Sequence, residues 1–178
     1  MKILVLNGSP RPKGNTKAMV MAFAEGAESI GHRVDIVDVC KLDIHGCIAC
    51  EHCHTKGNGT CVQQDDMQKI YTLFGEAEML VMASPIYFAG IPGQLKCAVD
   101  RFYAVFNPQA PGSAGKAKKF AAILSSAMPG VYGGATAVLT DSLAAGLGLE
   151  VVRVVTAGGE ENCSAAKLAE LRDLGKSL

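Results

Sequence analysis

The sequence predicts an α/β protein in which a five-stranded parallel sheet is covered by helices on both faces. Three observations support this fold class: short continuous apolar runs of strand length, helical-period segments between them, and turn residues directly after several runs. Alternating strands and helices with right-handed crossovers form a doubly wound, three-layer sandwich. Because no linker or internal repeat divides its 178 residues, we expect a single domain spanning 1–178.

The first third of the chain contains two predicted strands and one predicted helix. Lys2–Asn7 is a continuous apolar run, as expected for a strand buried on both faces. Residues 16–30 place apolar side chains at helical spacing, Gly31 is suited to end that helix, and 33–39 predict a second strand. Residues 40–64 show no sustained period, and irregular stretches of this length are typically functional or disordered.

The remaining chain continues the same alternation. Asp65 and Gln68 form a variant of the capping box, which predicts a helix from there to about Glu76. The further predicted strands are 79–83, 120–124 and 151–156, and the further predicted helices are 94–106, about 130–147 and 165–174.

Composition and charge exclude several classes of partner. Lys+Arg and Asp+Glu are equal at 17 each, which argues against binding a nucleic acid backbone. The first residues do not resemble a signal peptide, and no apolar stretch approaches the roughly 18–20 residues that cross a bilayer, so we expect no membrane partner. Seven cysteines without a secretory signal indicate a reducing, cytoplasmic location and favour metal or redox chemistry over disulfides.

The loop between the first strand and the first helix has the properties of a phosphate site. A helix N-terminus offers unpaired N–H groups and a positive dipole end, Ser9, Asn15 and Thr16 add donors, and Arg11 adds charge. Five residues separate Gly8 from the next glycine, which excludes a P-loop, and the dinucleotide fingerprint is also absent. A polar turn with a helix cap is the alternative interpretation.

The run Gly-Ser-Pro-Arg-x-x-Gly-Asn-Thr at 8–16 resembles the phosphate loop of the NAD(P)H-dependent FMN reductases, which have a flavodoxin-like fold. A second block, Ser-Pro-Ile-Tyr-Phe-Ala-Gly at 84–90, and Asp-Arg at 100–101 extend the resemblance over nearly the whole chain. It implies the sheet order 2-1-3-4-5, with both blocks at the switch point where ligands bind. It also implies a homodimer or higher homo-oligomer. The implied FMN-binding residues are Ser9, Arg11, Gly14, Asn15, Thr16, Pro85, Ile86, Tyr87, Phe88, Gly90 and Ser126.

The irregular stretch contains the motif Cys47-x2-Cys50-x2-Cys53-x7-Cys61. Cysteines at this spacing can converge on one metal or cluster. The motif resembles that of the iron–sulfur flavoproteins, which implies a [4Fe–4S] cluster. A zinc ion, a thiol relay or reversible disulfide, and four free thiols remain alternatives.

The other cysteines and the nearby histidines are given simpler interpretations. Cys40, Cys97 and Cys163 are expected to be buried small apolar residues. Three histidines border the motif and are expected to face solvent rather than act as ligands: His45, His52 and His54.

The resemblance implies an FMN-dependent oxidoreductase. NAD(P)H or a reduced redox-protein partner would supply electrons, and a small acceptor such as a quinone, free flavin or metal complex would receive them. We nominate no catalytic side chain, because the flavin carries the chemistry. The rival functions are a non-enzymatic flavodoxin-like electron carrier, which the zero net charge disfavours, and a flavin-free phosphate-binding protein.

Overall fold

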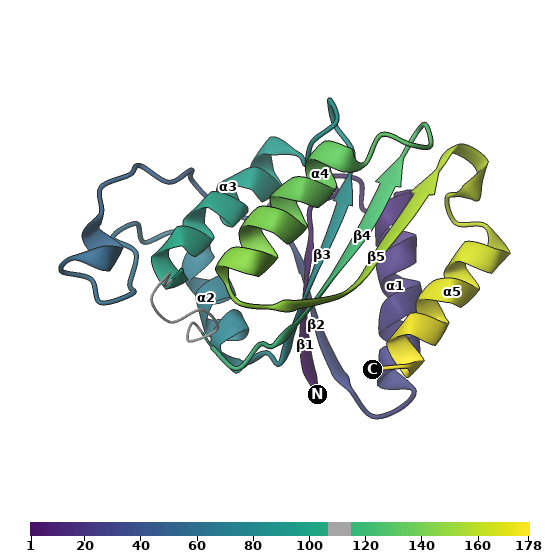
Figure 1. Ribbon diagram of the computed structural model, residues 1–178, viewed down its shortest axis with the longest axis horizontal. Helices are drawn as coiled ribbons and strands as arrows, with labels where there is room; N and C mark the ends of the chain where they lie inside the picture. Colours follow the sequence, from purple (N-terminus) through teal and green to yellow (C-terminus); the bar gives the residue numbers. More distant parts are fainter. Residues whose placement is uncertain (107–114) are drawn as a thin grey trace.

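The computed structural model describes residues 1–106 and 115–178 and confirms the predicted α/β sandwich. Five parallel strands form one sheet in the order β2-β1-β3-β4-β5 (Figure 1). Their bounds are β1 Lys2–Asn7, β2 Arg33–Asp38, β3 Met79–Pro85, β4 Lys119–Ser126 and β5 Glu150–Gly158. The predicted strand order is therefore correct.

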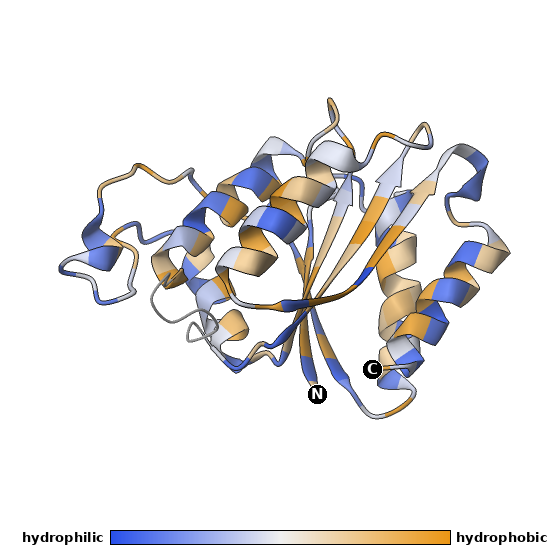
Figure 2. Ribbon diagram, in the orientation of Figure 1, coloured by the Kyte–Doolittle hydropathy of each residue, from blue (hydrophilic) through white to orange (hydrophobic). Residues whose placement is uncertain are grey.

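Helices cover both faces of the sheet. Helices α1 (Asn15–Glu28) and α5 (Ala165–Lys176) pack together on one face, while α2 (Met67–Glu76), α3 (Gly93–Arg101) and α4 (Gly133–Ala137) cover the other (Figure 1). Each face has its own cluster of buried apolar side chains. In Figure 2 the strands are mainly hydrophobic where they cross the middle of the sheet, whereas α3 and α5 carry both hydrophobic and hydrophilic residues.

Two segments predicted as single α-helices change helix type along their length. The helix predicted over 94–106 is α3 followed by the 3₁₀ turn η3 (Phe102–Val105). The helix predicted from Gly130 begins at Gly133 and widens into the π-helical segment η4 (Val138–Ala144). The apolar period alone does not distinguish these neighbouring helical forms, because all of them bury a similar stripe.

The capping box predicted at Asp65 and Gln68 is wrong. Helix α2 begins at Met67, and the side chain of its N-cap residue, Asp66, makes no capping hydrogen bond. The Gln68 amide donates to the Gln63 carbonyl instead, and the Asp65 carboxylate accepts from Arg101 and from the Met67 backbone N–H. Along residues 1–106 and 115–178, no helix combines the length and apolar character needed to cross a bilayer.

Candidate flavin and cysteine sites

The carboxyl edge of the sheet carries a cleft of about 200 Å³ between the loops that follow β1, β3 and β4. Nine of the eleven residues predicted to bind FMN line this cleft: Ser9, Arg11, Gly14, Asn15, Thr16, Pro85, Ile86, Tyr87 and Ser126. Ser125 and Ala127 complete the lining, whereas Phe88 and Gly90 lie outside it. Residues from three separate loops therefore meet at one site, at the edge where doubly wound folds bind ligands.

Backbone hydrogen bonds extend the sheet pattern into these loops. The Gly8 N–H donates to the Ala83 carbonyl over 2.8 Å, and the Ile86 N–H donates to the Ser125 carbonyl over 2.9 Å. A β-carbon on Gly8 would lie 2.6 Å from Leu95 Cδ2, so a small residue is needed where the first loop crosses α3. Backbone hydrogen bonds of the sheet thus hold the walls of the cleft.

The N-terminus of α1 is open to a ligand. Gly14 occupies the cap position and no side chain caps the helix, so the first-turn N–H groups remain available as donors. Helix α5 differs, because the Ser164 hydroxyl there accepts a hydrogen bond from the Lys167 N–H. A β-carbon on Gly14 would lie 2.9 Å from Arg11 Cβ, which explains glycine in this tight loop. An anion would satisfy the donors of α1.

A buried hydroxyl pair joins α1 to β4 beside this helix end. Thr16 Oγ1 lies 2.7 Å from Ser125 Oγ, and both side chains are almost fully buried. The predicted Ser126 hydroxyl instead bonds to the backbone of Met128 within its own turn. The sequence analysis missed Ser125, although strand alternation carried the signal: Ile123 faces α1, so the residue two positions later faces the same side.

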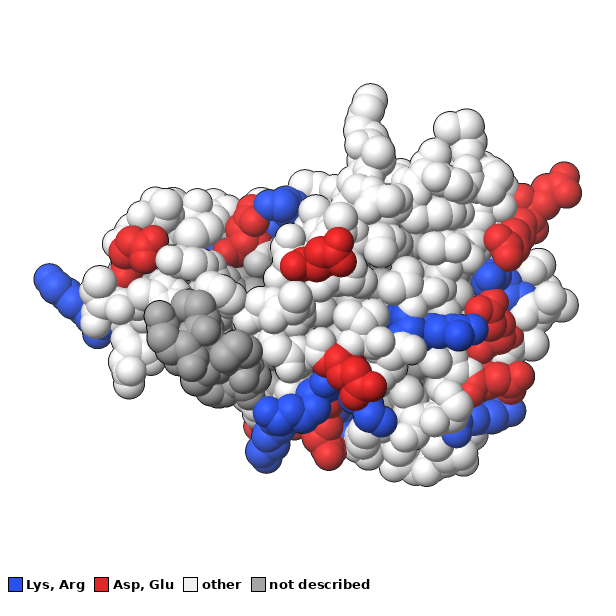
Figure 3. Space-filling model, in the orientation of Figure 1, with Lys and Arg blue, Asp and Glu red and all other residues white. Residues whose placement is uncertain are grey.

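A strained two-residue turn forms the outer lip of the cleft. The Tyr87 and Gly90 backbones exchange hydrogen bonds of 2.9 and 3.0 Å, and Phe88 and Ala89 both have positive φ, at 49° and 62°. Type I′ turns require this geometry, which usually selects Asn or Gly. The Phe88 side chain is fully exposed at the tip. In Figure 3 the projections at the top of this face carry no charged residues.

A polar cluster supports the first loop from the end of β2. Asp38 accepts hydrogen bonds from Asn7 Nδ2 at 2.9 Å, Lys17 Nζ at 2.9 Å and Lys41 Nζ at 2.7 Å. Partial burial alone would raise the pKa of the Asp38 carboxyl, but these hydrogen bonds outweigh it and hold that pKa well below its usual range.

The Asp38 cluster predicts a loss of stability in acid. Because the folded pKa lies below the unfolded value of about 3.9, the carboxylate contributes fully above that value and loses its contribution as pH falls toward the folded pKa. We expect Asp38→Asn to cost about 1–2 kcal/mol at pH 7 and much less at pH 2. Urea unfolding of both proteins at the two pH values measures this, and an equal cost at both would contradict it.

The four motif cysteines line one pocket of about 20 Å³ in the loop that projects beyond α3 (Figure 1). Cys47 and Cys50 are exposed, whereas Cys53 and Cys61 are partly buried. The residues Ala49 and Glu51 have left-handed backbones and lie between successive cysteines, and the Ala49 N–H donates to Cys47 Sγ over 3.5 Å. Within residues 1–106 and 115–178, no three side chains of metal-ligating type are close enough to hold an ion. The thiols thus share a pocket without forming a closed ligand set.

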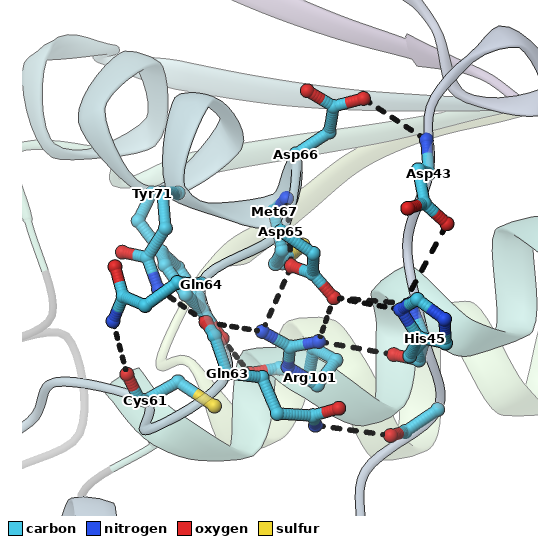
Figure 4. A network of polar contacts seen from close by, with 12 residues as sticks. Asp43, His45, Cys61, Gln63, Gln64, Asp65, Asp66, Met67, Tyr71 and Arg101 are labelled. Carbon is cyan, nitrogen blue, oxygen red and sulfur yellow. Dashed lines mark hydrogen bonds and ion pairs between the residues drawn. The ribbon is translucent and has the colours of Figure 1, made fainter.

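The two stems of this loop meet at a buried arginine (Figure 4). Arg101, 1% exposed, donates to both Asp65 carboxylate oxygens, at 2.6 and 3.1 Å, and to the His45 and Gln63 carbonyls at 3.0 and 3.3 Å. Burial would raise the pKa of Asp65, but the bonds from Arg101 and from backbone N–H groups lower it overall. The loop base is therefore fixed to the end of α3.

The prediction for the remaining cysteines is wrong. Cys40, Cys97 and Cys163 are only partly buried. The Cys40 thiol lies 3.1 Å from the Gly8 carbonyl, and the Cys163 thiol lies 3.6 Å from both oxygens of Asn15. Two of these cysteines thus border the first loop as weak polar groups, because the chain crosses there near the edge of the sheet.

Comparison with known families agrees with the cleft geometry. Residues 1–162 match the family of NADPH-dependent FMN reductases, a segment that contains all three cleft loops and the cysteine motif. The chain belongs to this family. The resemblance identified from residues 8–16 and 84–90 is therefore confirmed at the level of the family.

The curated relatives match only part of this chain. The chain is 34% identical over 101 residues to the iron-sulfur flavoprotein MJ1083 of Methanocaldococcus jannaschii, covering 57% of this chain and 51% of that protein. It is 35% identical over 101 residues to an iron-sulfur flavoprotein of Methanosarcina thermophila, covering 57% of this chain and 52% of that one. The matched segment thus spans about half the length of these curated relatives.

Solved structures at lower identity share the fold of this family member. The NAD(P)H:quinone oxidoreductase from Methanothermobacter marburgensis has a TM-score of 0.79 at 18% identity, covering 99% of this chain and 96% of that one. An FMN-dependent NADH-azoreductase from Bacillus anthracis, solved in complex with FMN, has a TM-score of 0.71 at 16% identity, covering 99% and 97%. Both solved structures therefore share the architecture of this chain.

Proposed function

We propose that this protein is an oxidoreductase that binds FMN in the cleft at the carboxyl edge of the sheet and passes electrons from NAD(P)H to a small acceptor. The observation that carries the proposal is the meeting of nine predicted FMN residues in one cleft beside an uncapped helix N-terminus. When bound, FMN supplies the hydride and single-electron chemistry, which side chains cannot perform.

Each part of the cleft has a distinct task in this proposal. The first-turn N–H groups of α1, the Thr16 hydroxyl and the Arg11 guanidinium hold the phosphate. Pro85, Ile86 and Tyr87 line the opposite wall, where an apolar and aromatic surface suits a flavin ring. The strained turn at Phe88 and Ala89 fixes that wall in place.

We further propose that Cys47, Cys50, Cys53 and Cys61 ligate a [4Fe–4S] cluster. The four thiols around one pocket have the donor chemistry of such a site and would have to move closer together to hold the cluster. The N–H donated to Cys47 is of the kind that stabilises sulfur ligands. Several curated relatives carry the name iron-sulfur flavoprotein. A bound cluster would give the protein a one-electron port, which suits a redox-protein donor. Zinc in the same pocket is the competing occupant.

Anaerobic purification followed by visible spectroscopy tests these proposals. We expect FMN uptake with a much weaker affinity for riboflavin, rapid bleaching by NADPH or NADH, and four iron and four sulfide per chain. Absence of FMN uptake would refute the flavin site. Uptake without bleaching by either nucleotide would favour the electron carrier, and zinc without sulfide would refute the cluster.

Arg11 provides a test of the phosphate end. We expect Arg11→Ala to weaken FMN binding by roughly 5- to 30-fold, because a charge-assisted phosphate contact is lost. The loss should shrink at high salt, since Arg11 is exposed. Riboflavin, which lacks the phosphate, is the control and should bind both proteins equally. An equal loss for both ligands in a fluorescence titration would contradict the assignment.

A further inference from the structure

We propose that Arg101 is a positioning residue for the four-cysteine pocket, which it organises by joining the two stems of the cysteine loop before any metal binds. The inference rests on the proposed metal-ligating role of these cysteines. It concerns a side chain outside the cleft proposed to bind FMN, since Arg101 is not among the residues that line that cleft.

The position of Arg101 links both ends of the motif. The carbonyl of His45 lies two residues before Cys47, and the carbonyl of Gln63 lies two residues after Cys61; both accept from the guanidinium. Asp65 accepts from both terminal nitrogens of Arg101 and also from the His45 backbone N–H. One planar group thus joins the stem that leads to the first cysteine to the stem that follows the last one (Figure 4).

Arg101 also borders the pocket that the cysteines surround. Its Nε–H has no hydrogen-bond partner among the described residues, although the side chain is 1% exposed. A buried donor without a partner is costly, and a sulfur ligand in the adjoining pocket would satisfy it. Four thiolates around a divalent ion carry net negative charge, which a fixed guanidinium stabilises. Geometry and charge therefore favour the same role.

The remaining stem contacts support a preformed base. The Asp66 N–H donates to the Asp43 carbonyl, and the Asp43 N–H donates to the Asp66 carboxylate, both over 3.0 Å. Gln63 Nε2 donates to the Gly46 carbonyl over 3.1 Å. Asp43 and Asp66 lie outside the cysteine pocket, and Gln63 lines it, but none of these contacts uses a cysteine thiol. They therefore order the stems without occupying ligand positions. Outer groups of this kind set the affinity of metal sites.

Titration of the full-length chain with Co²⁺ under anaerobic conditions, followed by thiolate-to-cobalt absorption, tests the inference. We expect Arg101→Met to weaken Co²⁺ binding roughly 10- to 100-fold and to reduce the thiolate band per bound cobalt. Arg101→Lys keeps the charge but cannot join both stems, so its affinity should remain at least roughly tenfold below wild type. Lys96→Met, an exposed charge on the same helix, is the control and should bind Co²⁺ as wild type does.

Far-UV circular dichroism and urea unfolding of the same samples report whether each variant is folded, and their FMN affinity tests the flavin site separately. Should Arg101→Met fail to fold, Asp65→Asn serves in its place, with a Co²⁺ affinity below that of wild type. Folded Arg101→Met, or Asp65→Asn in its place, with wild-type cobalt affinity and spectrum would overturn the inference. Full rescue by Arg101→Lys, or no Co²⁺ binding by wild type, would also overturn it, whatever the outcome for FMN.

Discussion

Thr16→Val is expected to weaken FMN binding by about 2 kcal/mol, or roughly 30-fold. The Thr16 hydroxyl lies at the open N-terminus of α1 and lines the cleft. Valine has nearly the same shape, so the change removes a donor without opening a cavity. It also leaves the buried Ser125 hydroxyl without the partner it has at 2.7 Å. Fluorescence titration of the apoprotein with FMN measures the effect.

Three comparisons make the Thr16 result specific. Thr16→Ser keeps the hydroxyl and should bind FMN within roughly threefold of wild type. Thr72→Val removes a hydroxyl that bonds to the Gln68 carbonyl on α2, away from the cleft, and should leave FMN affinity unchanged. Riboflavin should discriminate little between wild type and Thr16→Val. Equal FMN affinity of Thr16→Val and wild type would contradict the assignment of the phosphate site to this helix end.

Gly26→Ala is expected to lower the free energy of unfolding by about 3 kcal/mol. A β-carbon on Gly26 would lie 2.0 Å from the Arg172 carbonyl oxygen, and one on Gly175 would lie 2.4 Å from the Phe23 carbonyl oxygen. The backbones of α1 and α5 therefore touch directly, and neither can yield without moving a helix. Urea unfolding measures the loss, and we expect the midpoint to fall while the slope of free energy against urea concentration stays unchanged.

Gly75→Ala is the matched control for the helix packing. Gly75 lies in α2, and among residues 1–106 and 115–178 no atom outside its own stretch of helix is within 4 Å of the β-carbon that alanine would add. Alanine favours helix over glycine, so this variant should be as stable as wild type or up to about 1 kcal/mol more stable. Similar losses for Gly26→Ala and Gly75→Ala would show that helix propensity, rather than contact between α1 and α5, governs both positions.

The strands could be predicted because their signal is local and strong. Strands β1, β3 and β4 are buried on both faces, so their apolar runs are continuous and end where turn residues begin. The start of α2 could not be predicted in the same way. The Asp65 carboxylate bonds to the Met67 N–H but also to Arg101, 36 positions away. The Gln68 side chain bonds to the Gln63 carbonyl, so the predicted box does not form. A contact at such sequence separation leaves no mark in the local pattern.

Much of the lining of the cleft at the carboxyl edge could also be predicted, from the family resemblance and because parallel strands bring successive loops to one edge. The choice between Ser125 and Ser126 depended on which face each residue occupies, and the neighbouring apolar residues of β4 hold that information. The buried state of Arg101 was beyond such reasoning, since an arginine near a helix end is usually exposed. Its neighbours come from two stems whose approach only the folded chain defines.

Helix α3 gives the two candidate sites a common mechanical element. It begins at Gly93, just after the strained turn at the lip of the cleft, and ends at Arg101 beneath the cysteine loop. Nine helical residues rise about 13 Å, and a helix of this length resists bending far more than the loops at its ends. A shift of the loop base would therefore displace the lip of the cleft as well, because a rigid helix rather than a flexible loop connects the two sites.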